Sequence, residues 1–543
     1  MRRSISVFCL FAVLVWCVLA PRANAAQASC ESLAKLSLPN TKITLAQVVP
    51  AGTFVAPPPP YPMPVPPSYK DVPTFCRVTA EIAPTSDSDI KIEVWMPVSG
   101  WNGKFLGQGN GGFAGAIDYP GLGEAVKRGY ASAGTDTGHT TIDAAWALGH
   151  PEKVIDFGYR GVHEMTQKAE AIVQAFYGGG KRVPGAPPYP SFFASCSDGG
   201  REALMEAQRY PEDYDGILAG APANYWTHLL VAAMWELRAT NLDPASYIPA
   251  SKIPALSDAV LTACDAQDGL RDGLVNDPRQ CHFNPDTMLC KGADSDACLT
   301  APQADALKKI YAGPHDSQGL LLFPGLVPGG EAGEGGWTPW IIGNAPGRSL
   351  IGFFGIGYFS NFVYGKPNWD PKTFDVDEAT RLADQKTARA LNATDPNLRP
   401  FMQRGGKLIL YHGWSDAAIS PLNTIDYYRQ VEATLGAKDT QKFVRLYMVP
   451  GMQHCGGGSG PNSFGQAGSA AADNPQRNVF RALEDWVTGT APPEIIASKY
   501  VDDNPAKGVK MTRPLCPYPQ LARYKGSGDP NDATNFVCTA GKK

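Results

Sequence analysis

An alternation of strand-like and helix-like segments constrains the fold of this chain more than any other feature. Short runs rich in β-branched and aromatic residues alternate with segments of helical periodicity. These segments lie at residues 90–98, 104–107, 130–133, 161–177, 191–195, 199–210, 215–219, 407–412, 422–435, 444–449 and 478–487. Strands that alternate with helices form a mostly parallel sheet. We therefore expect an α/β fold.

The alternation stops between Pro222 and about Pro400. This interval is rich in aromatic residues and contains four cysteines and a glycine-rich stretch at 328–336. Because an interruption of about 175 residues is too long for a loop, it predicts an inserted domain. We assign residues 223–400 to the insertion and residues 26–222 and 401–543 to the main domain.

The first 25 residues have the pattern of a secretory signal peptide. Arg2 and Arg3 precede an apolar run from Ile5 to Ala20, and small residues follow up to Ala25. A membrane anchor is the alternative, but the run is shorter than the ~20 residues a bilayer needs, and no later segment is apolar enough. We expect a secreted or periplasmic protein without a membrane anchor.

The charge of the chain indicates which kinds of molecule it binds. Charged residues make up 18% of the chain, which argues against disorder driven by charge and against a coiled coil. The formal net charge is −4, and no basic tract stands out. A surface for nucleic acid or anionic membranes is therefore not expected, and a small-molecule partner is favoured.

Ten cysteines follow the predicted signal peptide, an even number in an oxidising compartment. Five disulfides are the expectation, and counting leaves their connectivity open. A zinc site is the alternative, but the chain has no CxxC pair. The ten are Cys30, Cys76, Cys196, Cys264, Cys281, Cys290, Cys298, Cys455, Cys516 and Cys538.

Ser197 lies between an apolar strand-like run and the start of a helical segment, with small residues on both sides. This is the setting of a nucleophile elbow, in which the serine stands at a sharp turn where the strand and helix backbones nearly touch. Ser195 replaces the first glycine of the usual GxSxG pattern. A serine that caps the helix N-terminus is the alternative.

A nucleophilic serine needs a base and a carboxylate, which in this architecture follow it in the order acid, then histidine. Asp416 follows the strand at 407–412, and His454 follows the strand at 444–449. Both positions belong to the edge of the sheet where active-site loops gather. His412 is the competing base, but it precedes Asp416 and ends a strand, so we favour His454.

Backbone amides are expected to bind the oxyanion of the reaction. The amide after the nucleophile, that of Asp198, is one candidate. Gly111 and Gly112 belong to a glycine-rich loop directly after the early strand at 104–107 and supply the others. A plain turn is the alternative reading of this loop.

A loop in the insertion presents three carboxylates among glycines, those of Asp265, Asp268 and Asp272. Hard oxygen ligands in a glycine-bent loop suit calcium, and the backbone carbonyls of Leu270 and Leu274 complete the set. The spacing differs from that of an EF-hand, and an acidic turn is the alternative.

Five stretches of the chain resemble the tannase and feruloyl esterase family, which also contains mono(2-hydroxyethyl) terephthalate hydrolases. The stretches are SCSDGGREALMEAQRYPEDYDGILAGAPA, YHGWSDAAISPLNTIDYY, VPGMQHC, GQGNGGFAG and CDAQDGLRDGLVNDPRQC. The resemblance extends from about Cys30 to Cys538. It implies an α/β-hydrolase core whose inserted lid, residues 223–400, holds one structural calcium.

The resemblance also implies individual roles. Ser197 is the nucleophile, His454 the base and Asp416 the orienting acid, while the five loop residues named above bind calcium. The implied disulfides are Cys30–Cys76, Cys196–Cys455, Cys264–Cys281, Cys290–Cys298 and Cys516–Cys538. The departure is Ser195, where the family commonly has glycine, and it questions the geometry of the turn more than the chemistry.

The implied activity is that of a secreted serine carboxylesterase acting on esters of aromatic acids such as ferulate or gallate. A terephthalate monoester hydrolase is the alternative within the enzyme class. Such an enzyme must pair a substrate carboxylate with a cationic lid residue, and the lid stretch 351–364 contains no Arg or Lys. A non-catalytic binding protein on a hydrolase scaffold is the alternative outside it.

Overall fold

The computed structural model describes residues 28–58, 67–178, 189–466 and 472–541. The predicted signal peptide lies outside the described residues. Within them, none of the helices combines the length and apolar character needed to span a bilayer.

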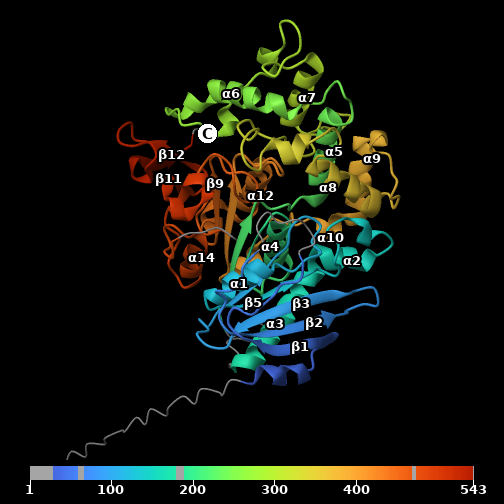
Figure 1. The fold of residues 1–543 in the computed structure, drawn as a ribbon, viewed down its shortest axis with the longest axis vertical. Helices are drawn as coiled ribbons and strands as arrows, with labels where there is room; N and C mark the ends of the chain where they lie inside the picture. The colour runs from blue at the N-terminus through green and yellow to red at the C-terminus, as the bar shows by residue number, and fades with distance from the viewer. Residues whose placement is uncertain (1–27, 59–66, 179–188, 467–471, 542–543) are drawn as a thin grey trace, which may run out of the picture.

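A nine-stranded sheet forms the centre of the molecule (Figure 1), in the order β1-β2-β3-β5-β4-β6-β7-β8-β9. The first four strands in this order, β1, β2, β3 and β5, pair antiparallel with one another. The six strands β5, β4, β6, β7, β8 and β9 run parallel to one another. The bounds are β1 Thr41–Val49, β2 Phe75–Ile82, β3 Ile90–Pro97, β4 Phe105–Gln108, β5 Ala131–Thr135, β6 Ser191–Cys196, β7 Gly216–Gly220, β8 Lys407–Gly413 and β9 Val444–Val449. The expected mostly parallel α/β fold is confirmed.

Helices cover both faces of this sheet, which explains why its central strands are continuous apolar runs. One face packs against α3, α4 and α12, and the other packs against α1 and α14. The bounds of these helices are α1 Tyr119–Lys127, α3 Gly161–Tyr177, α4 Asp198–Arg209, α12 Pro421–Leu435 and α14 Val479–Val487. Two short helices, α2 Pro151–Ile155 and α13 Ala437–Thr440, complete this part.

Between β7 and β8, all residues are described and none adds a strand to the sheet. The helices here are α5 Trp226–Thr240, α6 Ile253–Cys264, α7 Ala301–Ala312, α8 Leu350–Tyr358, α9 Val376–Ala383, α10 Arg389–Leu391 and α11 Arg399–Gln403. Six of them, α5 to α10, share an apolar cluster that also includes Phe113 and Ile419 from loops beside the sheet and Phe157 from the helical segment Asp156–Arg160. Phe401 of α11 packs in the cluster of the main sheet. We call residues 223–400 the lid; in Figure 1, α6 and α7 lie at the end of the molecule opposite β1.

The chain ends in two small antiparallel sheets, which the strand pattern did not predict. They pair β10 Ile495–Tyr500 with β11 Val509–Leu515, and β12 Gln520–Tyr524 with β13 Phe536–Ala540. The second sheet lies against the lid, because Asn276 Nδ2 donates to the carbonyl of Ala522 at 3.0 Å.

Ten cysteines form five disulfides, with the pairing that the family resemblance implies. They are Cys30–Cys76, Cys196–Cys455, Cys264–Cys281, Cys290–Cys298 and Cys516–Cys538. Four of them close loops of at most 46 residues, whereas Cys196 and Cys455 are 259 positions apart.

Candidate active site

Ser197 stands at a strained turn between β6 and α4. Its backbone has φ 67° and ψ −123°, a left-handed conformation that L-residues rarely adopt. The Ser197 amide donates to the carbonyl of Gly220 on β7 at 3.0 Å, which anchors the turn to the sheet. Strain of this kind is typical of functional sites and holds the serine side chain at the end of the strand.

The small residues around Ser197 are needed because the backbones approach closely. A Cβ on Gly200 would lie 2.3 Å from the carbonyl oxygen of Gly220, and one on Gly199 would lie 1.9 Å from Ser195 Oγ. Gly109, on the neighbouring loop, is also within 2.8 Å of Ser195 Oγ by the same measure. The hydroxymethyl group of Ser195 therefore occupies space that these two glycines leave open.

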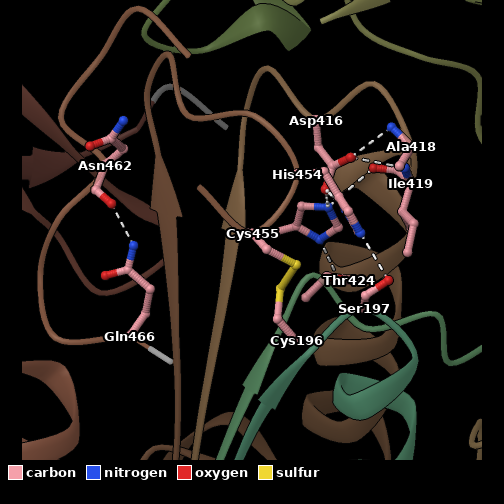
Figure 2. Close-up of a disulfide and its surroundings, with 11 residues drawn as sticks. Cys196, Ser197, Asp416, Ala418, Ile419, Thr424, His454, Cys455, Asn462 and Gln466 are labelled. Atoms are coloured by element: carbon pink, nitrogen blue, oxygen red, sulfur yellow. Dashed lines mark hydrogen bonds and ion pairs between the residues drawn. A yellow bond between two sulfur atoms is a disulfide. The ribbon is translucent and has the colours of Figure 1, made fainter. Parts of the chain in front are cut away.

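His454 links Ser197 to Asp416 (Figure 2). Its Nε2 lies 2.8 Å from Ser197 Oγ, and its Nδ1 lies 2.8 Å from Asp416 Oδ2. The three side chains come from the ends of β6, β9 and β8, whose carboxyl ends meet at one edge of the parallel sheet. The structure thus brings together the three predicted catalytic residues.

Asp416 is buried, and both oxygens of its carboxylate accept hydrogen bonds. Oδ1 accepts from the amides of Ala418 and Ile419 at 2.8 and 2.9 Å, and Oδ2 accepts from His454. Burial by itself raises the pKa of Asp416, but the neighbouring His454 and His412 outweigh it and hold this pKa well below its usual range. Asp416 is therefore ionised at neutral pH.

The sequence pattern left His412 as the alternative base. In the structure its ring contacts Asp416. His412 is fully buried, and its Nε2 lies 3.0 Å from Asp416 Oδ2, the oxygen that also contacts His454 Nδ1. The sequence pattern did not predict that His412 contacts Asp416, or that its Nδ1 contacts Thr424. The i, i+4 spacing of His412 and Asp416 was the available signal.

The Cys196–Cys455 disulfide joins the residues adjacent to Ser197 and His454 (Figure 2). The two Cα atoms are 6.0 Å apart. The nucleophile turn and the histidine loop are thereby covalently connected within one residue of each reacting side chain.

The glycine-rich loop after β4 is attached to the nucleophile turn through Asn110. The Asn110 carbonyl accepts from the Gly199 amide at 2.9 Å, and the Asn110 amide donates to Glu202 Oε2 at 2.8 Å. Glu202 lies on α4, and burial is the main cause that raises its pKa to about 8. These contacts bring the loop that contains Gly111 and Gly112 beside Asp198, the first residue of α4.

Aromatic side chains of the lid lie over His454. The ring of Trp340 meets that of His454 edge to face at 5.1 Å, and Phe354 stacks on Trp340 at 6.2 Å. Phe354 also lies close to the glycine loop, since a Cβ on Gly112 would be 3.1 Å from its ring. Lid side chains beside the base are therefore aromatic.

The predicted calcium loop has the oxygen donors of a cation site, but its carboxylates do not converge. Both oxygens of Asp265 accept amides, those of Asp272 and Gly273, and Asp272 Oδ2 contacts Arg513 of β11. Burial, followed by the charges of Asp272 and Asp265, raises the pKa of Asp268 to about 6. The donor set fits a hard divalent cation, and the carboxylates must turn to coordinate one.

The described residues bring three or more potential metal-ligating side chains together at two other places. One group joins Asp294 to Cys290 and Cys298, which are paired in a disulfide and hold no free thiolate. The other group contains His163, Glu206 and Asp213. Neither group includes a residue of the predicted calcium loop.

The family model described as tannase and feruloyl esterase matches residues 76–539. The chain belongs to this family. An uncharacterized esterase of Xanthomonas campestris pv. campestris is 43% identical over 541 residues, covering 94% of this chain and 91% of that protein. Feruloyl esterase B of Aspergillus niger is 31% identical over 469 residues, covering 86% of each chain.

Solved structures of family members have the same fold. An esterase from Aspergillus oryzae matches with a TM-score of 0.84 at 29% identity, covering 94% of this chain and 99% of that one. Feruloyl esterase B from the same organism matches with a TM-score of 0.83 at 28% identity, covering 94% and 100%. This tannase and feruloyl esterase family member is an α/β-hydrolase and a carboxylic ester hydrolase that acts on small-molecule esters.

Proposed function

We propose that this family member is a secreted serine esterase that hydrolyses esters of aromatic acids of the hydroxycinnamic or galloyl type. The observation that carries the proposal is the contact of His454 with both Ser197 and Asp416, each at 2.8 Å. Five disulfides and the predicted signal peptide support an oxidising compartment, either the periplasm or the exterior of the cell.

His454 acts first as a general base and then as a general acid in the proposed reaction. Its Nε2 takes the proton of Ser197 Oγ as this oxygen attacks the ester carbonyl, and it returns that proton to the departing alcohol. The product of this half-reaction is an acyl-Ser197 ester. Water, deprotonated by the same Nε2, then hydrolyses the acyl-enzyme and releases the acid.

Asp416 and the backbone stabilise the charges that develop. The ionised Asp416 carboxylate stabilises the imidazolium and keeps the Nδ1 proton of His454 directed toward itself. The amide of Asp198 and those of Gly111 and Gly112 are the proposed donors to the oxyanion. Preorganised amides of this kind lower the barrier because they need no reorientation during the reaction.

The lid supports an aromatic, uncharged acyl group. Trp340 and Phe354 offer ring faces and edges beside His454, and aromatic pairs favour stacked or edge-to-face contacts. A terephthalate monoester also has an aromatic ring, but its free carboxylate needs a cation. The lid stretch 351–364, which contains Phe354, provides none.

Calcium is proposed as a structural cation of the lid. Asp265, Asp268 and Asp272 would hold it with the carbonyls of Leu270 and Leu274. When bound, the ion supplies charge neutralisation to the loop and takes no part in ester hydrolysis. The loop lies beside β11 and β12, so the ion would brace the lid against the C-terminal sheets.

A hydrolysis panel tests the proposed function. Methyl ferulate and methyl gallate are expected to be hydrolysed much faster than mono(2-hydroxyethyl) terephthalate. Ser197→Ala and His454→Ala are each expected to lower kcat by about 10,000-fold or more, because nucleophile and base act as a unit. Diisopropyl fluorophosphate should label Ser197. An unlabelled Ser197 together with no turnover of any ester would reject the proposal and favour a binding protein.

A further inference from the structure

Asp416 Oδ2 is shared by two histidines. His454 Nδ1 lies 2.8 Å from this oxygen, and His412 Nε2 lies 3.0 Å from it. His412 is fully buried and is the penultimate residue of β8, four residues before Asp416. One carboxylate oxygen at the centre of the proposed reaction thus has a second ring nitrogen beside it.

The partners of His412 assign its tautomer. Its Nε2 faces two acceptors, Asp416 Oδ2 and the carbonyl of Ile419 at 3.1 Å, so this nitrogen carries the proton. Its Nδ1 lies 2.7 Å from the hydroxyl of Thr424 on α12. The Thr424 hydroxyl, which can donate or accept, is the partner of this nitrogen.

We propose that His412 is a positioning residue of the active site: the two acceptors at its Nε2 fix the tautomer in which it donates to Asp416, and Thr424 satisfies its Nδ1. This inference rests on the proposed function, because it assigns His412 to the same reaction. The hydrogen-bond partners of His412 are Asp416, Ile419 and Thr424, and Ser197 is not among them. His412 acts through the carboxylate that orients His454.

The physical consequence concerns the basicity of His454. A hydrogen bond to the charged form of a carboxylate stabilises that form and disperses its negative charge. The second donor on Oδ2 therefore weakens the attraction of Asp416 for the imidazolium of His454. Loss of this donor should strengthen that attraction and shift the acidic limb of kcat/KM to higher pH.

Few other groups can produce such a shift. The titratable side chains that contact Asp416 are His412 from β8 and His454 from the loop after β9. From the other elements, Ser197 and Trp340 face His454, and Thr424 faces His412. None of these three carries a charge at neutral pH.

Nitrogen-15 NMR of histidine-labelled protein tests the arrangement without any ester. In the wild-type protein, the chemical shifts of His412 should report a proton at Nε2. His412→Phe removes the donor but keeps a planar ring, and it should move the His454 Nδ1 proton resonance downfield, because the hydrogen bond of His454 to Asp416 strengthens. His412→Gln retains an N–H donor and should restore most of the wild-type value.

A second pair of variants separates the donor at Nε2 from the contact at Nδ1. Thr424→Val keeps the shape of the side chain and removes the hydroxyl, so His412 loses its Nδ1 partner but keeps the proton at Nε2, and the His454 Nδ1 proton resonance should stay at its wild-type position. Thr424→Ser keeps the hydroxyl and should also leave both as in the wild type. An unchanged His454 Nδ1 proton resonance in folded His412→Phe, or a His412 proton at Nδ1 in the wild type, a result that needs no variant to fold, would overturn the inference.

Kinetics then separates this inference from the proposed function. If the wild-type protein hydrolyses no aromatic ester, the proposed function fails while the NMR result on His412 stands by itself. If it does hydrolyse them, the acidic limb of kcat/KM should move to higher pH in His412→Phe and stay near its wild-type position in His412→Gln and in the two Thr424 variants. A role that is merely structural would lower the melting temperature without moving this limb.

Discussion

At the scale of single residues, the nucleophile turn depends on what Ser195 is packed against. Its Oγ points to the positions where Gly109 and Gly199 have no side chain. A serine is therefore tolerated where the family commonly has glycine, and the left-handed backbone of Ser197 is retained. The side-chain volume that Ser195 adds is balanced by volume that its neighbours lack.

Gly199→Ala is expected to disrupt this turn. The new Cβ would lie 1.9 Å from Ser195 Oγ and 2.7 Å from the Asn110 carbonyl oxygen. Overpacking of this kind costs about 1–3 kcal/mol of the free energy of unfolding, and turnover should fall with the displaced Ser197. Thermal denaturation and kcat measure both effects. The double variant Ser195→Gly, Gly199→Ala should recover part of the loss, and no recovery would contradict this account.

The buried carboxyl group of Glu236 is expected to make the free energy of unfolding depend on pH. Glu236 is a buried residue of α5 in the lid, and burial raises its pKa to about 8. Between its unfolded pKa near 4.5 and this value, the native state binds more protons than the unfolded state. The contribution of Glu236 to stability is therefore lost progressively as the pH rises through this window.

The neutral substitution Glu236→Gln tests this sign. Near pH 4.5 the variant and the wild type should unfold at similar temperatures, whereas at pH 8 the variant should be more stable by on the order of 3 kcal/mol. Chemical denaturation at the two pH values measures the difference. Parallel pH profiles for the two proteins would show that Glu236 is not protonated in the native state.

At the scale of elements, the lid is attached to the main domain by its own core and by the C-terminal sheets. Its apolar cluster includes Phe113 from a loop beside the sheet and Phe157 from the helical segment Asp156–Arg160. The calcium loop contacts β11 through Asp272 and Arg513, and the nearby Asn276 contacts β12. A cation in this loop would therefore act on two elements at once.

Removal of calcium is expected to destabilise the lid. Without a cation the charges of Asp265 and Asp272 repel that of Asp268, and at a calcium concentration a hundred times Kd the lost binding corresponds to about 3 kcal/mol. EDTA should lower the melting temperature, excess calcium should restore it, and elemental analysis should find calcium. Asp268→Asn should weaken the response to EDTA. A melting temperature that EDTA does not change, in a protein free of calcium, would eliminate the site.

At the scale of the whole molecule, one disulfide connects the segments of the main domain that precede and follow the lid in the chain, and it does so at the active site. Cys196 and Cys455 are 259 positions apart, and the entire lid lies between them in the chain. Each is adjacent to a proposed catalytic residue. The bond thus constrains the distance between Ser197 and His454 as well as the unfolded chain.

The variant Cys196→Ala, Cys455→Ala is expected to fold and to lose most of its activity. Loss of so long a cross-link costs up to ~5 kcal/mol in the chain-entropy model. A displacement of ~1 Å between nucleophile and base can lower the rate ~100-fold, so kcat should fall more than substrate affinity. Cys290→Ala, Cys298→Ala, which opens an eight-position loop in the lid, is the control and should keep kcat. Equal kcat in both variants would contradict the positioning role.

Local patterns in the sequence determined the part of the fold that carries the site. The strands β4 to β9 are short apolar runs covered on both faces, so their composition predicts them without knowledge of their partners. The positions of Ser197, Asp416 and His454 at the ends of β6, β8 and β9 followed from the same pattern. The parallel sheet then brings these ends together.

Tertiary structure alone decided which elements complete the molecule and which contacts tune the site. β1 alternates irregularly between exposed and half-buried residues, and its pairing with β2 stabilises it more than its own composition. Likewise, β10 to β13 are short and partly polar, and pairing with a partner strand stabilises each of them. Trp340 meets His454 and Thr424 meets His412 across different elements, and no local pattern encodes such contacts because packing between distant segments produces them.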